Sequence, residues 1–154
     1  MKKRTAFRFG TAGFLFLLAA VFWGLGCAPK CTNLKTCTAD GSKAYTHSCP
    51  NGSCAFPCNG GNAELDCKGG KCVAEANSSE TVKLKCSGGG CKFLANGSGT
   101  RVLDCPGNNC EMICTGSAKC QLTGCTSGCK LACNGTGACS QTCKDASCTT
   151  TKPQ

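Results

Sequence analysis

Cys86-Ser87-Gly88-Gly89-Gly90-Cys91, followed by Lys92-Phe93-Leu94-Ala95 and then by Asn96-Gly97, is the stretch that decides the fold. Turn-forming residues separate the two cysteines, and they predict a tight corner. Phe93 and Ala95 stand two residues apart, a spacing that places both side chains on one face of a β-strand. Asn96-Gly97 predicts a second turn. The stretch therefore predicts a corner closed by cysteines, a short strand and another turn.

The same unit recurs along the chain. Six cysteine-bounded corners follow one another, and the steps between their first cysteines are 18, 19, 19, 20 and 18 residues. In three units a leucine stands two residues before the corner, at Leu65, Leu84 and Leu103. A fixed period of this length is typical of a repeat architecture. The corner cysteines, whose partners the sequence leaves open, are Cys49, Cys54, Cys67, Cys72, Cys86, Cys91, Cys105, Cys110, Cys125, Cys129, Cys143 and Cys148.

Two strands and two turns in about 19 residues predict one coil of a parallel β-solenoid. We expect an all-β, disulfide-rich solenoid of about five coils. Coils stack about 4.8 Å apart, so corner cysteines of successive coils lie within the Cα separation that a disulfide accepts. Pairing across a single corner is the other possibility. The alternative fold is a chain of antiparallel β-hairpins, each closed by its own bridge, because Asn-Gly also signals hairpins. Recurring columns of like residues favour the solenoid.

A second group of cysteines recurs at equivalent places in two coils. Its members are Cys114, Cys120, Cys133 and Cys139. In two other coils both cysteines are replaced together, by Ala76 and Val82 and by Ala95 and Arg101. Residues that appear and vanish as a pair are expected to be bonded, so we predict the bridges Cys114–Cys120 and Cys133–Cys139.

The amino-terminal residues have the layout of a secretory signal peptide. Lys2, Lys3, Arg4 and Arg8 form a cationic start, and no charged residue follows until after Gly26. This pattern predicts a signal peptide over 1–26 and export of the rest of the chain. The alternative is an uncleaved anchor, because the apolar stretch is about long enough to span a bilayer.

The end of this segment, Gly24-Leu25-Gly26-Cys27, resembles the lipobox of bacterial lipoproteins, in which a small residue precedes the cysteine that receives the lipid. Leu25 stands one place late, and Gly24 occupies the usual aliphatic position. The resemblance covers residues 1–27 and implies lipidation of Cys27 and attachment to a membrane of the cell envelope. The alternative is ordinary cleavage nearby, which would leave a soluble periplasmic or extracellular protein.

The composition of the remaining 128 residues requires covalent stabilisation. They hold all 20 cysteines but only 13 Leu, Ile, Val and Phe residues. Such a chain cannot offset its conformational entropy by hydrophobic burial alone. Disulfides persist outside the cytosol, and each short bridge contributes about 2–3 kcal/mol. We expect an irregular tether or cap over 27–48, a Cys-rich repeat domain over 49–148 and a polar tail over 149–154.

The chain lacks the motifs of most catalytic and metal sites. No Cys-x-x-Cys pair occurs, which counts against zinc ribbons and thioredoxin-type redox centres. His47, the only histidine, is interpreted as an exposed loop residue. We therefore expect no catalytic residue, no cofactor and no metal site, and no nucleic-acid partner. A thiolate metal-binding protein is a less favoured alternative, because it would need reduced thiols.

These observations favour a non-catalytic, lipid-anchored scaffold of the cell envelope. A binding module for anionic glycans or lipids is the second hypothesis, since the mature chain carries 13 basic and 8 acidic residues. Its predicted basic face consists of Lys68, Lys71, Lys83, Lys85, Lys92 and Arg101.

Overall fold

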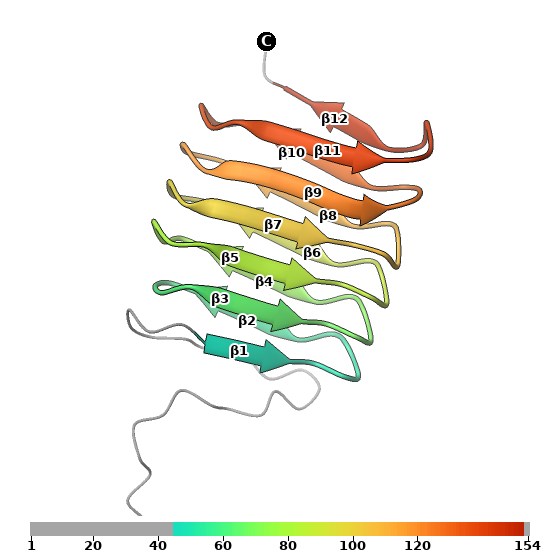
Figure 1. Ribbon diagram of the computed structural model, residues 1–154, viewed down its shortest axis with the longest axis horizontal. Coiled ribbons are helices and arrows are strands. Elements are labelled where there is room, and N and C mark those ends of the chain that lie inside the picture. Colours follow the sequence, from blue (N-terminus) through green and yellow to red (C-terminus); the bar gives the residue numbers. More distant parts are fainter. Residues whose placement is uncertain (1–44, 153–154) are drawn as a thin grey trace, which may run out of the picture.

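The computed structural model describes residues 45–152, and in them the chain winds into a stack of coils (Figure 1). Strands alternate along the chain between two six-stranded sheets, ordered β1-β3-β5-β7-β9-β11 and β2-β4-β6-β8-β10-β12. The strands are β1 (Tyr45–Ser48), β2 (Ala55–Cys58), β3 (Ala63–Asp66), β4 (Val73–Ala76), β5 (Val82–Lys85), β6 (Lys92–Ala95), β7 (Thr100–Asp104), β8 (Glu111–Cys114), β9 (Lys119–Cys125), β10 (Lys130–Cys133), β11 (Cys139–Cys143) and β12 (Thr149–Thr151).

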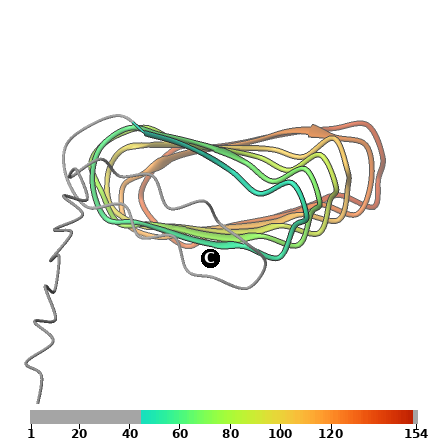
Figure 2. The same ribbon diagram turned by 90° about the horizontal axis from the view of Figure 1, so that it is seen from below.

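Every pairing between these strands is parallel. The predicted β-solenoid is therefore confirmed, and the chain of antiparallel hairpins is excluded for residues 45–152. Figure 2 shows the coils end on as flattened loops, with the sheets along the two long sides. One short side, the cysteine corner, holds the six Cys-bounded turns. The other, the asparagine corner, holds the turns at 59–62, 77–81, 96–99, 115–118 and 134–138.

Every second side chain along the strands points inward, and these side chains fill the space between the two sheets. In β6, Phe93 and Ala95 are buried, whereas Lys92 and Leu94 are partly exposed. The same side of the neighbouring strands supplies the column Phe56, Ala74, Phe93, Met112 and Leu131. The facing sheet supplies the column Leu65, Leu84, Leu103 and Leu122, as the leucine spacing predicts.

Regular structure extends beyond the predicted repeat domain 49–148 at both ends. β1 lies inside the predicted tether and β12 inside the predicted polar tail, so each sheet has six strands where about five coils were expected. Each of these strands pairs with a neighbouring strand that offers backbone N–H and C=O groups for hydrogen bonding. This backbone pairing is enough to form a strand even though the side chains show no apolar pattern. At the carboxyl end the inward positions become polar. Gln141 follows Leu122 and Thr150 follows Leu131, and the Thr150 hydroxyl donates to Gln141 Oε1 at 2.8 Å.

The interpretation of His47 as an exposed loop residue is wrong. His47 lies in β1 in register with Leu65, and only 5 % of its surface is exposed. Its ring stacks on Phe56, with 6.5 Å between ring centroids. The residue thus occupies the inward position that leucine fills in the following coils. Burial lowers the pKa of His47 below its ordinary value of 6.5.

Glycines let the backbones of successive cysteine corners touch. Gly89 has a φ of 75°, in the left-handed region, and a Cβ atom at this position would collide with the carbonyl oxygen of Gly107 in the next corner. Gly90 has a φ of 66°, but a Cβ there would meet only Lys71 Cγ, at 3.5 Å. Both glycines have a left-handed φ, but only Gly89 must also leave room for the backbone of the next corner. Comparing substitutions at the two positions therefore distinguishes the effect of close stacking from the effect of the unusual φ.

We predict that Gly89→Ala destabilises the fold far more than Gly90→Ala. The Gly90 variant should lose about 1–2 kcal/mol, the usual effect of a left-handed non-glycine residue. The Gly89 variant must also push two coils apart, and we expect a loss above about 4 kcal/mol or failure to fold. Guanidinium unfolding of the oxidised proteins measures both values. Equal losses would show that the corners do not depend on backbone contact.

A second prediction concerns acid stability. Because the pKa of His47 is lower in the folded chain, the unfolded chain binds a proton first, and stability present above pH 6.5 declines as the pH falls below that value. His47→Leu continues the leucine column and should remove this decline. The measurement is the guanidinium midpoint between pH 7.5 and 5, together with amide exchange in β1. If stability declines in the same way with falling pH in the wild type and in His47→Leu, His47 is not the group responsible for the decline.

Candidate functional site

A ladder of disulfides along the cysteine corner is the main chemical feature of the described residues. Each corner is closed by its own bridge, with Cα separations of 6.2 to 6.4 Å. The structure thus selects pairing across a single corner over pairing between coils. The bridges are Cys49–Cys54, Cys67–Cys72, Cys86–Cys91, Cys105–Cys110, Cys125–Cys129 and Cys143–Cys148.

Two more bridges cross the asparagine corner inside the solenoid. They join Cys114 to Cys120 and Cys133 to Cys139, the pairs that share one spacing in the sequence. The described residues therefore hold eight disulfides. Cys27, the predicted lipidation site, lies outside the described residues. Bridges in this number indicate an oxidising, exported environment.

Stacking brings the sulfur atoms of successive corners together. The Sγ atoms of Cys49, Cys54 and Cys72 all lie within 4.8 Å of one another, and three further groups repeat this closeness. The further groups are Cys67, Cys72 and Cys91; Cys86, Cys91 and Cys110; and Cys125, Cys143 and Cys148. Metals bind thiolates, and a bridged sulfur is not one. In its oxidised form the ladder offers bonded sulfurs for exchange reactions and no ligand set for a metal.

Accessibility changes along this ladder. The cysteines of the first five corners are at most 3 % exposed, whereas Cys143 and Cys148 are only partly buried. β11 and β12 are the last strands of their sheets in the described part of the chain. Within the ladder of the described residues, the carboxyl-terminal bridge is therefore the one that a solute molecule reaches most easily.

Arg101 is fully buried at the asparagine corner, with an exposed fraction of 0 %. Its Nη1 donates to the carbonyl oxygens of Glu80 and Thr100, and its Nη2 to those of Ser78 and Asn96. Burial lowers the pKa of Arg101, an effect that Cys58 opposes. Two of the four acceptors belong to the preceding turn, so one guanidinium joins two coils. Ala95 and Arg101 are in register with Cys114 and Cys120, and the arginine thus stands where the next coil has a disulfide.

Side-chain amides form a second link between turns. Asn96 Nδ2 donates to Asn77 Oδ1 at 2.8 Å, and Asn77 Nδ2 donates to Asn59 Oδ1 at 3.3 Å. The Thr115 hydroxyl continues the row by donating to Asn96 Oδ1. Stacked, in-register amides of this kind stabilise parallel strands. The recurring asparagines are therefore explained by coil stacking.

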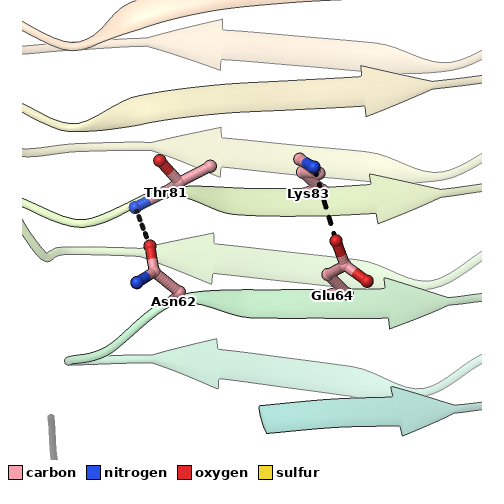
Figure 3. Close-up of polar contacts among 4 residues, drawn as sticks. All are labelled: Asn62, Glu64, Thr81 and Lys83. Atoms are coloured by element: carbon pink, nitrogen blue, oxygen red, sulfur yellow. Dashed lines mark hydrogen bonds and ion pairs between the residues drawn. The ribbon is translucent and has the colours of Figure 1, made fainter. Parts of the chain in front are cut away.

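A shallow groove of about 340 Å³ crosses the outer face of the β1–β11 sheet. Its charged residues lie in rows: Glu64 and Asp66 on β3, Lys83 and Lys85 on β5, and Asp104 on β7. Figure 3 shows two links across the first rows, the ion pair between Lys83 Nζ and Glu64 Oε1 at 3.4 Å and the Thr81 amide donating to Asn62 Oδ1 at 3.0 Å. Rows of opposite sign largely neutralise one another, as expected for a solvated charge ladder.

The six residues of the predicted basic face do not lie together, so that prediction is wrong. Arg101 is buried, and Lys92 lies on the other sheet, where it pairs with Glu111 at 3.1 Å. Lys83 pairs with Glu64, and Lys68 pairs with Asp66 at 3.8 Å. The sequence alone did not reveal this arrangement, because only the stacking of neighbouring coils places an acidic residue beside most of these lysines.

No protein-family model matches the chain, and no match was found among curated proteins or among solved structures. In the described part of the chain no helix is long and apolar enough to cross a membrane. The function is therefore inferred from the residues and their geometry.

We predict that Arg101→Met destabilises the solenoid by about 2–3 kcal/mol, because buried carbonyls of two turns lose a charged donor. Arg101→Lys keeps the positive charge but lacks the forked guanidinium group, so it should lose less stability than Arg101→Met. Guanidinium unfolding gives these values.

The strand register also indicates a double substitution that should restore the stability lost in Arg101→Met. Ala95→Cys combined with Arg101→Cys should form a bridge like Cys114–Cys120 and recover about 2 kcal/mol relative to Arg101→Met. Peptide mapping shows whether the new bridge forms. A bridged double variant that is no more stable than Arg101→Met would contradict the view that arginine replaces a disulfide here.

Proposed function

We propose that the chain is an exported, non-catalytic scaffold of the cell envelope, held to a membrane by a lipid on Cys27. The observation that carries this proposal is the column of disulfides, one at each cysteine corner of the described residues. Such bonds survive outside the cytosol, and the signal-like segment 1–26 supplies the route there. The lipobox resemblance at Gly26-Cys27 supports the anchor.

Rigidity supports the scaffold role. In a solenoid each coil contacts only its neighbours, so the stack is held by links that repeat at every step. Here those links are the parallel backbone ladders, the asparagine row and the Arg101 fork. Each corner is in addition closed covalently. The result is a stiff body with two flat faces, suited to presenting a surface or spacing other components.

The positions of the charged groups favour this role over polymer binding. The groove alternates acidic and basic rows, and Lys68 and Lys83, two exposed residues of the predicted basic face, already have acidic neighbours. His47 faces the interior beside Phe56 and presents no side chain to the groove. Both observations support a surface that acts by its shape.

The anchor is tested by Cys27→Ala in the full chain, produced with its own signal in a bacterial host. Wild-type protein should fractionate with membranes and show the mass of a diacylated Cys27. The variant should become soluble and keep the same eight bridges. Cys31→Ala is the matched control and should stay with the membranes.

Two outcomes separate the parts of this proposal. A soluble, unlipidated wild-type protein with intact bridges would remove the anchor and leave an exported scaffold. Native protein with 20 free thiols would overturn the scaffold itself and favour metal binding instead.

A further inference from the structure

We propose that the carboxyl-terminal corner, Cys143–Cys148, is a thiol–disulfide exchange site that reacts with external thiols and passes the exchange to the bridge Cys125–Cys129. The inference rests on the arrangement of four sulfur atoms and does not depend on the lipid anchor. Its substrates are small thiols or the exposed cysteine of a thiol-bearing partner.

Access is confined to this end of the ladder. Cys143 and Cys148 are partly exposed, while the cysteines of the other five corners are buried. An attacking thiolate must reach a sulfur atom directly, so burial protects the inner bridges. Among the corner bridges of residues 45–152, the carboxyl-terminal one is thus the first at which an external thiol can react.

The sulfur atoms are placed for a second exchange. Cys148 Sγ lies 3.9 Å from Cys125 Sγ, and Cys125, Cys143 and Cys148 form one group within 4.8 Å. The strands hold this arrangement, because Cys125 and Cys143 are register partners and the Thr149 amide donates to the Cys129 carbonyl at 2.9 Å. A thiolate released at Cys148 therefore starts beside the next disulfide.

The chemistry conserves electrons at each step. A thiol loses its proton to solvent, and its thiolate attacks Cys143, forming a mixed disulfide while the Cys143–Cys148 bond breaks and Cys148 leaves as thiolate. The Cys148 thiolate then attacks Cys125, forming Cys125–Cys148 while the Cys125–Cys129 bond breaks and Cys129 leaves. The number of disulfides is unchanged, since one bridge has become a mixed disulfide.

Cys129 is suited to be the leaving group. The backbone amide of Cys110 donates to Cys129 Sγ at 3.4 Å. A hydrogen bond to the charged form favours a thiolate, and a more stable thiolate leaves faster. The exchange therefore moves the reduced sulfur from a partly exposed position, at Cys148, to a buried one, at Cys129.

The first test uses the wild-type chain and reduced glutathione in small excess, followed by acid quenching, alkylation after unfolding and peptide mapping. We expect a glutathione adduct on Cys143, a new Cys125–Cys148 bridge and an alkyl label on Cys129. The bridges from Cys49 to Cys110 should remain intact. Adducts spread over all corners, or an adduct with Cys125–Cys129 unchanged, would overturn the proposal.

The second test removes the external thiol. In Cys143→Ser, Cys148 has no partner in its own corner. We expect Cys148 to attack Cys125 and release Cys129, so that the alkyl label is found on Cys129 and not on Cys148. Cys139→Ser is the matched control. Neither Cys133 nor Cys139 belongs to a close sulfur group among residues 45–152, so the label should stay on Cys133. A label that stays on Cys148 in the first variant would show that no exchange occurs.

Discussion

The narrow space between the two sheets is the constraint on which the rest of the structure depends. Each strand turns only two or three side chains inward, and most of these are small or of medium size, such as Ala74, Leu84 and Cys114. So thin an interior buries little apolar area, and hydrophobic burial alone would not hold the chain. Closing every cysteine corner restricts the unfolded chain and contributes about 2 kcal/mol for each short loop. Because stability in a repeat adds along the stack, one bridge per coil stabilises every step.

The fold was predictable from the sequence, whereas much of the chemistry was not. Columns such as Leu65, Leu84 and Leu103 specify stacking because only parallel coils place like residues in contact. The pairing of the corner cysteines was undetermined, since both arrangements satisfy the Cα limits of a disulfide. His47 escaped prediction because four residues of β1 show no clear period, and its strand forms through backbone pairing with β3. Arg101 was assigned to the surface by its residue type, and only the turn carbonyls around it show why it is buried.

Arg101 shows that one structural requirement at the asparagine corner has two chemical solutions. The turn leaves an interior space that one coil fills with Cys114–Cys120 and the coil before it with a guanidinium. The disulfide ties the two sides of its own turn. The arginine also binds the carbonyls of the preceding turn, and thus links coils where no bridge crosses that corner. Burying this charge without a paired carboxylate is tolerated because four carbonyl dipoles surround it.

The ladder differs in reactivity from one end to the other, and this difference reconciles a stable scaffold with exchange chemistry. Reaction at an inner bridge would open a corner between two coils and weaken both of its interfaces. The exchange that begins at Cys143–Cys148 involves the last two corners, and the inward side chains of the last coil, Gln141 and Thr150, are already polar. Since stability depends on nearest neighbours, exchange between these two corners leaves the coils farther from this end as they were. Among the corner bridges of residues 45–152, the partly exposed one therefore lies where exchange disturbs the scaffold least.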